Sequence, residues 1–288
     1  MKRVFSCLLL ICLLLTTGCD ILPTAPTQPT VPPTESTTKA PTTTTKAPSS
    51  KTVTVYLLEK IGSKDTDHVE FSYDEQHNLI SAKRVFIEPA VEPEEESTTE
   101  YTDYFENPDE HGMPTSVRRC WSETDQSNTL LTYTDDGKLN TVEKTSIPFN
   151  GYTFRYDEEG RLIDQSYLVN NRAEWSLIYD YADGKLKAAR CVDADNNPLY
   201  KITVKGGRIT KEAYAVDDTK WHAYTYQYDD HGNISKKSYS TESGTVSTTR
   251  YTYKTVKVPA DRAAYIREQQ TRLTMIDQPL PFAQYRTK

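Results

Sequence analysis

The sequence predicts an all-β fold, in which an antiparallel meander of repeated β-hairpins forms a curled sheet or partial barrel after a disordered stalk, with a short C-terminal helix. Three observations predict it. A tyrosine or its substitute recurs at intervals that settle to 23 to 25 residues, which indicates a repeated supersecondary unit. A turn motif follows most of these positions, and apolar residues alternate with polar ones between the turns. The repeat positions are Tyr73, Tyr104, Tyr133, Tyr156, Tyr181, Val204, Tyr228 and Tyr253.

The first 18 residues have the features of a secretory signal peptide. Lys2 and Arg3 precede an apolar run of leucines, and small residues follow that run. The run is about a dozen residues long, too short to cross roughly 30 Å of hydrocarbon. We therefore expect residues 1–18 to be a cleaved signal peptide and not a permanent transmembrane helix.

The signal ends in a segment, Leu15 to Cys19 (LTTGC), that resembles the lipobox of bacterial lipoproteins. The resemblance implies that the Cys19 thiol is diacylated and that Cys19 becomes the first residue of the mature chain. It departs from the family pattern at Thr16, where an aliphatic residue is usual. A lipid on Cys19 would anchor the protein to the extracytoplasmic face of a cell membrane. The alternative is an ordinary signal peptide that is cleaved without lipidation.

Residues 19–51 are expected to form a lipid-anchored linker. Pro and Thr dominate this segment, so it cannot bury a core, and it is typical of a disordered, partly polyproline II stalk. At about 3.1 Å per residue it could extend up to about 90 Å from the bilayer. Its threonines would suit O-glycosylation, but an unmodified spacer fits equally well.

The charge of the chain argues against nucleic acid as a partner. Without residues 1–18 the chain has 32 Lys and Arg against 41 Asp and Glu, a net charge of −9 with neutral histidine. Such an anion is repelled by phosphate backbones and by anionic lipid headgroups. We therefore expect contact with the membrane through the lipid anchor alone, and no binding of nucleic acid.

Cysteine usage excludes a fold held together by disulfides. Cys7 and Cys12 belong to the signal peptide and Cys19 is the lipidation candidate, so only Cys120 and Cys191 remain in the folded part. In an open meander these two are about six strands, or about 29 Å, apart. A disulfide needs Cα atoms within about 7 Å, so we expect two free thiols.

The repeat region, residues 52–258, reads as paired strands and turns. In the segment Tyr156 to Leu162 (YDEEGRL), the residue types at Asp157 and Gly160 are typical of a type I turn followed by a glycine bulge. Asp183-Gly184 and Gly206-Gly207 suit shorter type I′ turns. Each turn keeps an apolar pair opposite, namely Tyr156 with Leu162, Tyr181 with Leu186, and Val204 with Ile209.

This motif resembles the YD repeat of bacterial Rhs and wall-associated proteins and of teneurins. The best copy matches at Tyr156, Asp157, Gly160, Arg161 and Leu162, and the resemblance covers residues 71–254. It implies a β-sheet shell or spiral. The chain has few repeats and no recognisable toxin domain, so only the sheet architecture is carried over. The copies near His77 and from Tyr104 to Gly112 depart from the turn pattern.

Residues 259–288 are expected to form a C-terminal capping segment. From Pro259 to Met275 the sequence fits one helix with a ragged apolar stripe, formed by Ala263, Ile266, Leu273 and Met275. Terminal units of repeat proteins need such a cap because no further unit covers them.

Few residues suggest catalysis or a cofactor. Asp74, Asp157, Asp229 and Asp230 could pair for acid–base chemistry, but their positions already suit turns. The run from Asp193 to Pro198 (DADNNP) lacks the glycine and glutamate of an EF-hand, so it reads as a turn. The histidines have no metal-binding spacing, and no G-x-S-x-G motif is present. A hydrolase therefore remains a minor alternative, and we expect no cofactor and no metal.

Two groups of surface residues remain open to interpretation. A glutamate cluster is either a solvated loop or a weak cation or docking site; it comprises Glu88, Glu92, Glu94, Glu95, Glu96 and Glu100. A single-layer sheet cannot bury both faces, so aromatic residues of one strand parity could form an exposed binding surface. These are Trp175, Tyr179, Tyr181, Trp221, Tyr224, Tyr226 and Tyr228.

The sequence thus favours a cell-envelope lipoprotein that displays a β-repeat binding or structural domain outside the membrane. Its partner could be a cell-wall glycan or an envelope protein. The alternative is a carrier that holds an apolar envelope ligand in the cavity of a curved sheet.

Overall fold

The computed structural model describes residues 51–62, 67–88, 97–146, 148–215 and 221–275. The predicted signal peptide, lipidation site and nearly all of the stalk lie outside these residues. The described part contains sixteen strands, one α-helix and one 3-10 helix. They are β1 (Thr52–Gly62), β2 (His68–Tyr73), β3 (Leu79–Glu88), β4 (Ser97–Pro108), β5 (Pro114–Cys120), β6 (Gln126–Tyr133), β7 (Leu139–Ser146), β8 (Phe149–Tyr156), β9 (Leu162–Val169), β10 (Arg172–Ala182), β11 (Lys185–Asp193), β12 (Pro198–Lys205), β13 (Arg208–Ala215), β14 (Trp221–Tyr228), β15 (Ile234–Thr241), β16 (Gly244–Pro259), α1 (Ala263–Arg272) and η1 (Leu273–Met275).

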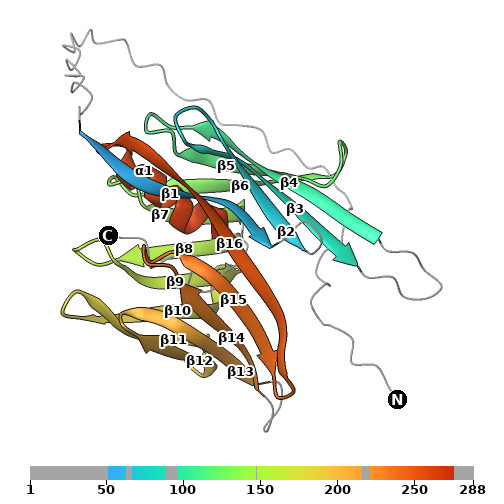
Figure 1. Cartoon of the computed structure of the whole chain (residues 1–288), viewed down its shortest axis with the longest axis vertical. Helices are drawn as coiled ribbons and strands as arrows, with labels where there is room; N and C mark the ends of the chain where they lie inside the picture. Colours follow the sequence, from blue (N-terminus) through green and yellow to red (C-terminus); the bar gives the residue numbers. More distant parts are fainter. Residues whose placement is uncertain (1–50, 63–66, 89–96, 147, 216–220, 276–288) are drawn as a thin grey trace, which may run out of the picture. The chain divides into compact units, whose positions relative to one another are not determined.

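The strands form a closed antiparallel barrel. Each strand pairs with its neighbour in sequence, and β1 pairs with β16. The meander, the hairpin repeats and the C-terminal helix are confirmed, whereas the expectation of a curled sheet or partial barrel is wrong. The reason is the length of β16: its first half pairs with β15 up to Arg250, and its second half pairs with β1 from Tyr251 to Pro259 (Figure 1). Closure leaves no exposed sheet edge.

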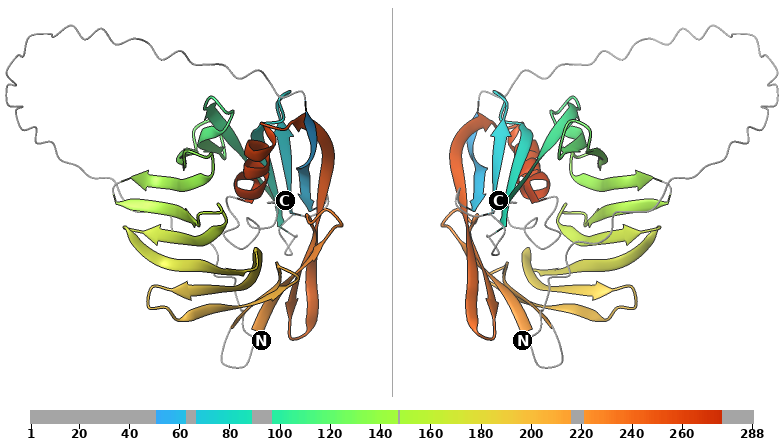
Figure 2. Two further views of the ribbon diagram at one scale, coloured as in Figure 1. Left: turned by 90° about the vertical axis from the view of Figure 1, so that its left-hand side faces the viewer. Right: turned by 90° about the vertical axis from the view of Figure 1, so that its right-hand side faces the viewer.

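The core lies inside the barrel. Side chains of alternate residues from the strands form one continuous cluster that includes Phe71, Leu131, Leu177 and Ile209. Barrels of more than about eight strands leave interior space that their own side chains do not fill. Part of that space is occupied by α1, which lies within the curve of the sheet in both views of Figure 2.

The motif turns have the predicted geometry. Gly160 has φ +74°, and the shorter turns have positive φ at both central positions, for example +59° and +76° at Gly206 and Gly207. These values fit a glycine bulge and type I′ turns, respectively. The three predicted cross-strand pairs are formed as expected, Tyr156 with Leu162, Tyr181 with Leu186 and Val204 with Ile209.

A hydrogen bond that the sequence did not indicate connects successive units. The motif tyrosine donates its hydroxyl to the carbonyl of the residue that follows the turn of the preceding unit, as Tyr156 does to Leu139 at 2.8 Å. After most of these acceptor residues the strand register shifts by one residue, a bulge that frees main-chain groups from the ladder. We call this set of bonds the tyrosine ladder. Its further members, with donor–acceptor distances of 2.6 to 3.0 Å, are Tyr73–Leu58, Tyr133–Pro114, Tyr181–Leu162, Tyr228–Ile209 and Tyr253–Ile234.

One repeat position was assigned wrongly from the sequence. Tyr104 lies within β4 opposite Arg118 and is 38% exposed, so it is not a ladder residue. The turn of this unit begins four residues later: Pro108 faces Pro114, and Asp109 accepts a hydrogen bond from the Met113 amide at 2.8 Å. The prediction relied on the spacing of tyrosines, and it failed in this unit because Pro108 takes the position of the motif tyrosine.

Helix α1 supplies hydrogen-bond acceptors to the barrel wall. Oε1 of Gln270 accepts from the Leu58 amide at 2.8 Å, and Oε1 of Gln269 accepts from the Leu79 amide at 2.7 Å. Glu268 accepts from the Leu139 amide at 3.0 Å. Buried amides need such partners. The predicted helix is therefore present, and it fixes one side of the barrel from within.

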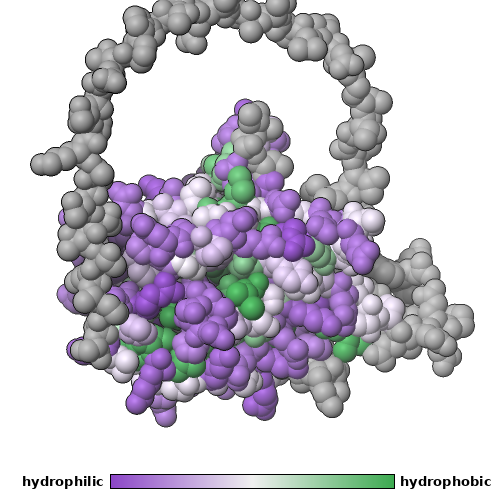
Figure 3. Space-filling model, turned by 90° about the horizontal axis from the view of Figure 1, so that it is seen from above, coloured by the Kyte–Doolittle hydropathy of each residue, from purple (hydrophilic) through white to green (hydrophobic). Residues whose placement is uncertain are grey.

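One face of the molecule is mostly polar. Figure 3 shows hydrophilic residues over most of one face, with small separate hydrophobic areas. In the described segments, neither helical element combines the length and the hydropathy needed to cross a membrane.

We predict that Tyr156→Phe lowers the free energy of unfolding by about 1 kcal/mol, because it leaves the Leu139 carbonyl without the ladder hydroxyl. Urea denaturation measures this change. The control is Tyr167→Phe, since the Tyr167 hydroxyl makes no hydrogen bond within the described residues while its ring packs on Tyr152 and Trp175. Equal losses for the two variants would contradict a stabilising role for the ladder.

Candidate functional site

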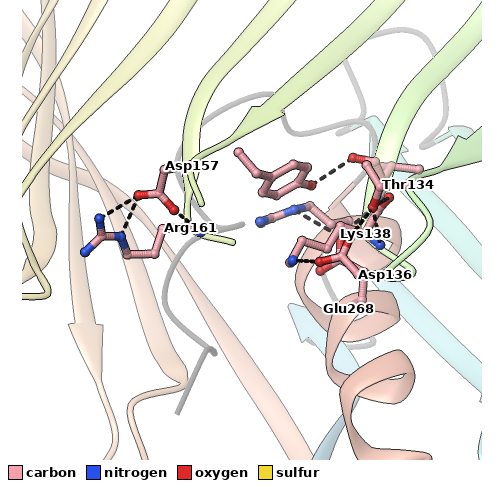
Figure 4. A network of polar contacts seen from close by, with 9 residues as sticks. Thr134, Asp136, Lys138, Asp157, Arg161 and Glu268 are labelled. Carbon is pink, nitrogen blue, oxygen red and sulfur yellow. Dashed lines mark hydrogen bonds and ion pairs between the residues drawn. The ribbon is translucent and has the colours of Figure 1, made fainter. Parts of the chain in front are cut away.

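The motif aspartates build turns. Asp157 Oδ1 accepts from the Arg161 amide at 2.8 Å, and its other oxygen pairs with the Arg161 guanidinium (Figure 4). Asp74 and Asp229 bind Asn78 and Asn233 in the same way. Desolvation opposes ionisation of Asp157, but hydrogen bonds and the charge of Arg161 leave its pKa below the ordinary value. These carboxylates are engaged in local structure, as predicted.

The run from Asp193 also forms a turn. Asp193 Oδ1 accepts from the amides of Asp195 and Asn197 at 2.9 and 2.8 Å. No group of three or more metal-ligating side chains is present in the described segments. Four members of the predicted glutamate cluster, Glu92 and 94–96, fall outside those segments.

A cavity of about 280 Å³ lies where the motif turns of β8 to β15 meet α1. Its walls come from three sources: the turns at Arg161, Lys185 and Arg208, the side of α1 that carries Arg267, and the start of β1. The full lining is Thr54, Val55, Tyr56, Arg161, Leu162, Tyr181, Gly184, Lys185, Leu186, Gly206, Gly207, Arg208, His231, Asn233, Arg267, Gln270 and Arg272. We call it the rim cavity.

The rim cavity coincides with a gap in the tyrosine ladder. Val204 takes the register position of a ladder tyrosine, facing Ile209, but it has no hydroxyl to reach the Leu186 carbonyl. Leu186 and the two turns on either side of this gap line the cavity. The other gap in the ladder, at Pro108, lies beside α1. There Gln269 and the buried Met113 occupy the position of the missing tyrosine. The gap at Val204 therefore leaves open space.

Cations dominate the charged lining of this cavity. The cations of the lining are Arg161, Lys185, Arg208, Arg267 and Arg272, and none of the lining residues that the structure describes is a carboxylate. Arg161 is paired with Asp157 at 2.6 Å and Arg272 with Glu268 at 3.4 Å. Within the described segments, Lys185, Arg208 and Arg267 form no ion pair. The cavity therefore has uncompensated positive charge, although the chain as a whole is acidic.

Turn length explains why two of these cations are uncompensated. In the longer turn, Asp157 stands four residues before Arg161 and neutralises it. The two-residue turns lack this aspartate: the residue before Asp183-Gly184 is Ala182, and the residue before Gly206-Gly207 is Lys205. Lys185 and Arg208 thus keep the cation position of the motif without its counterion.

Aromatic rings form another part of the wall. The Arg161 guanidinium lies 4.8 Å from the centre of the Tyr181 ring. The Arg208 guanidinium lies 5.1 Å from the centre of the Tyr228 ring, which is not itself among the described lining residues. Tyr56 stacks on His231 at 4.5 Å. Burial raises the pKa of Tyr181 to about 12, so its hydroxyl stays protonated and donates to Leu162.

The predicted aromatic surface faces inward. Tyr179 and Tyr226 are 3% and 6% exposed, so they belong to the core and the expectation of an exposed stripe is wrong for them. Closure of the barrel is the cause, because it turns this strand face to the interior. Trp175, Tyr181, Tyr224 and Tyr228 are partly buried against the core. Of the six residues whose side chains the structure describes, Tyr181 alone lines the rim cavity. Trp221 begins β14, and its side chain lies outside the described part.

The cations of the rim cavity were missed at the level of sequence. The signal that could have found them is a region where the chain departs from the repeat motif at three positions. Val204 replaces the motif tyrosine, and Ala182 and Lys205 stand where the motif has aspartate. Arg267 could not be assigned because nothing in the sequence places α1 beside these turns.

A second polar group lies deeper in the barrel. Glu212 is fully buried, with the Tyr226 hydroxyl 3.2 Å from Oε2, and Oε1 has no hydrogen-bond partner in the described segments. Burial raises the pKa of Glu212 to about 8. Burial lowers the pKa of Lys237, and the Glu212 carboxylate opposes that effect.

Both folded-region cysteines are free thiols in the structure, and Cys191 is buried. Burial raises the pKa of Cys191 to about 12. The premise of an open sheet was wrong, but closure of the barrel has not brought the two cysteines into a disulfide.

We predict that the free energy of unfolding falls as pH rises from 5 to 9 and that Glu212→Gln removes part of this dependence. The folded pKa near 8 lies above the ordinary 4.5, so the protonated form stabilises the fold below about pH 4.5 and that contribution is lost as pH rises through 8. The difference in the free energy of unfolding between wild type and Glu212→Gln should change by roughly a few kcal/mol between pH 5 and 9. Denaturation at several pH values measures it. The exposed Glu174→Gln is the control, and identical pH profiles for all three proteins would contradict the assignment.

Comparisons with known proteins give weak similarities. No protein-family model matches the chain, and no curated protein matches it. Among solved structures, a porin-like protein from Bacteroides uniformis is 14% identical with a TM-score of 0.45, over 72% of this chain and 99% of that one. The TcdB2-TccC3 structure is 12% identical with a TM-score of 0.28, over 69% of this chain and 13% of that one.

Proposed function

We propose that this chain is a non-catalytic binding protein, held by a lipid on Cys19 at the extracytoplasmic face of a cell membrane, and that its barrel binds a ligand in the rim cavity. The observation that carries the binding role is the open, charged cavity at the ladder gap. A stalk of Pro and Thr would keep that cavity away from the bilayer.

The lining supports binding more than catalysis. The permanently charged groups of the cavity are cations, and neither a carboxylate nor a cysteine stands among the lining residues that the structure describes. The one imidazole of that lining, His231, is stacked on the Tyr56 ring at 4.5 Å. General acid–base or nucleophilic catalysis needs a base within hydrogen-bond reach of a reacting group. The titratable side chains here are instead suited to hold an anionic group.

A carrier of an apolar envelope ligand is the alternative. The inward-facing aromatic side chains favour it. Against it, one cluster of interior side chains packs with Leu273 of η1, a second packs with Ala263 and Ile266 of α1, and α1 lies within the barrel. The partner of the binding protein would be a small envelope solute or a cell-wall glycan, with no role for nucleic acid.

We expect native mass spectrometry of the gently purified protein to show no copurifying lipid. Solvent extraction of the same sample should likewise release no apolar molecule, because a lipid bonded covalently to Cys19 stays with the protein. A stoichiometric, non-covalent lipid in the barrel would contradict binding at the rim and favour the carrier.

We expect Cys19→Ala to release the protein from the membrane fraction. The substitution removes the thiol that would be acylated, and two acyl chains are needed for stable anchoring. Fractionation with immunodetection measures the change. Cys12→Ala, inside the predicted signal peptide, is the control and should stay with the membrane. A Cys19→Ala protein that also remains there would contradict lipid anchoring.

A further inference from the structure

We propose that the rim cavity binds a phosphate ester. This inference rests on the proposed binding role and specifies the chemical class of the ligand. The lining combines flat aromatic surfaces with three cations that have no ion pair in the described part of the chain, Lys185, Arg208 and Arg267. No competing carboxylate stands among the described lining residues.

The number and type of cations favour phosphate over a single carboxylate. A phosphate monoester has a charge of about −1.5 to −2 near neutral pH and three acceptor oxygens. Guanidinium groups match two of those oxygens at once, whereas an ammonium group acts as a point charge. Arg208, Arg267 and Lys185 together supply both kinds of donor, and they come from two turns and the helix, so they surround the cavity from different sides.

The size of the cavity sets the size of the ligand. Its volume of about 280 Å³ is far larger than one water molecule, whose share of liquid volume is about 30 Å³, and lies near the lower end of small-molecule pockets. The phosphate of a small ester would therefore leave room for a group such as one sugar ring. The Tyr181 ring offers that group an apolar wall.

The site is created by departures from the repeat. A ladder tyrosine at position 204 would direct its hydroxyl toward the Leu186 carbonyl, as Tyr181 does toward Leu162 and Tyr228 toward Ile209. An aspartate at the motif position of either short turn would neutralise Lys185 or Arg208. Lys185 also packs beside Gly207, since a Cβ built on Gly207 would lie 3.6 Å from the Lys185 Cβ. The turns at Lys185 and Arg208 thus border the unfilled space and also carry cations that have no counterion.

Two sources of the phosphate are distinguished by experiment. The full chain, purified under native conditions, is titrated with glucose 1-phosphate by isothermal calorimetry. Separately, it is mixed with vesicles of phosphatidic acid, a lipid phosphate monoester, in phosphatidylcholine and tested by flotation, using protein that lacks the acyl chains through Cys19→Ala. Binding in the first arm indicates a soluble phosphate ester, and binding in the second a lipid headgroup. Succinate is titrated as a dicarboxylate of comparable charge.

Two variants test the site itself. Lys185→Ala combined with Arg208→Ala should weaken binding of the phosphate probe at least about tenfold, because it removes two charge-assisted contacts. The control combines Lys187→Ala with Lys205→Ala, which removes the same charge from exposed residues beside the same turns that do not line the cavity. Val204→Tyr should fill the gap and weaken binding by a similar factor while it keeps or raises the melting temperature.

The inference is overturned if neither phosphate probe binds, or if the control pair weakens binding as much as the Lys185 and Arg208 pair. Binding of succinate alone, with the same dependence on Lys185 and Arg208, would overturn the phosphate assignment and leave the proposed binding role intact. A copurifying apolar ligand in the barrel would instead overturn the binding role at the rim.

Discussion

The hydrogen bond from a motif tyrosine to the carbonyl after the preceding turn is the interaction on which this barrel depends. A single hairpin of this length cannot bury its apolar face alone, so each unit must be fixed to its neighbour. The bulge after most of these turns frees main-chain groups. The tyrosine of the next unit donates its hydroxyl to the freed carbonyl, and its ring packs against the core. At about 1 kcal/mol each, six such bonds set the register between units as well as their stability.

Closure and the ladder are connected through β1 and α1. Tyr73 donates to the Leu58 carbonyl on β1, although no motif turn precedes Leu58. The backbone amide of Leu58 donates to Gln270 of α1. The helix thus contributes to the wall at the first units, where the ladder is incomplete at Pro108. The cavity lies at the gap at Val204, where Arg267, Gln270 and Arg272 of α1 form part of its lining.

Local features could be predicted from the sequence, whereas features that depend on distant contacts could not. The turn at Gly160, the type I′ turns and the pair of Tyr156 with Leu162 follow from residue types a few positions apart. Closure depends on β1 pairing with a strand about 200 residues away in the sequence. The alternation of apolar and polar residues does not indicate which strand pairs with the edge of the sheet. The inward direction of Tyr179 and Tyr226 then follows from closure. The unit at Pro108 was misplaced because the pattern was searched through its tyrosines, and the shared aspartate and glycine, Asp109 and Gly112, would have found it. Arg267 joins Lys185 and Arg208 only through the position of α1.

The closed barrel is the claim on which both the ladder and the cavity depend, and the distance between its first and last strands tests it most directly. Spin labels at Thr54 and Lys257, which are partners across β1 and β16 and are both exposed, can be measured by double electron–electron resonance after the native cysteines are replaced by serine. Closure predicts a narrow distribution below roughly 20 Å, because paired strands lie about 4.8 Å apart and the labels add the rest. A distribution centred beyond roughly 30 Å, approaching about 70 Å for a flat sheet of this strand number, would contradict it.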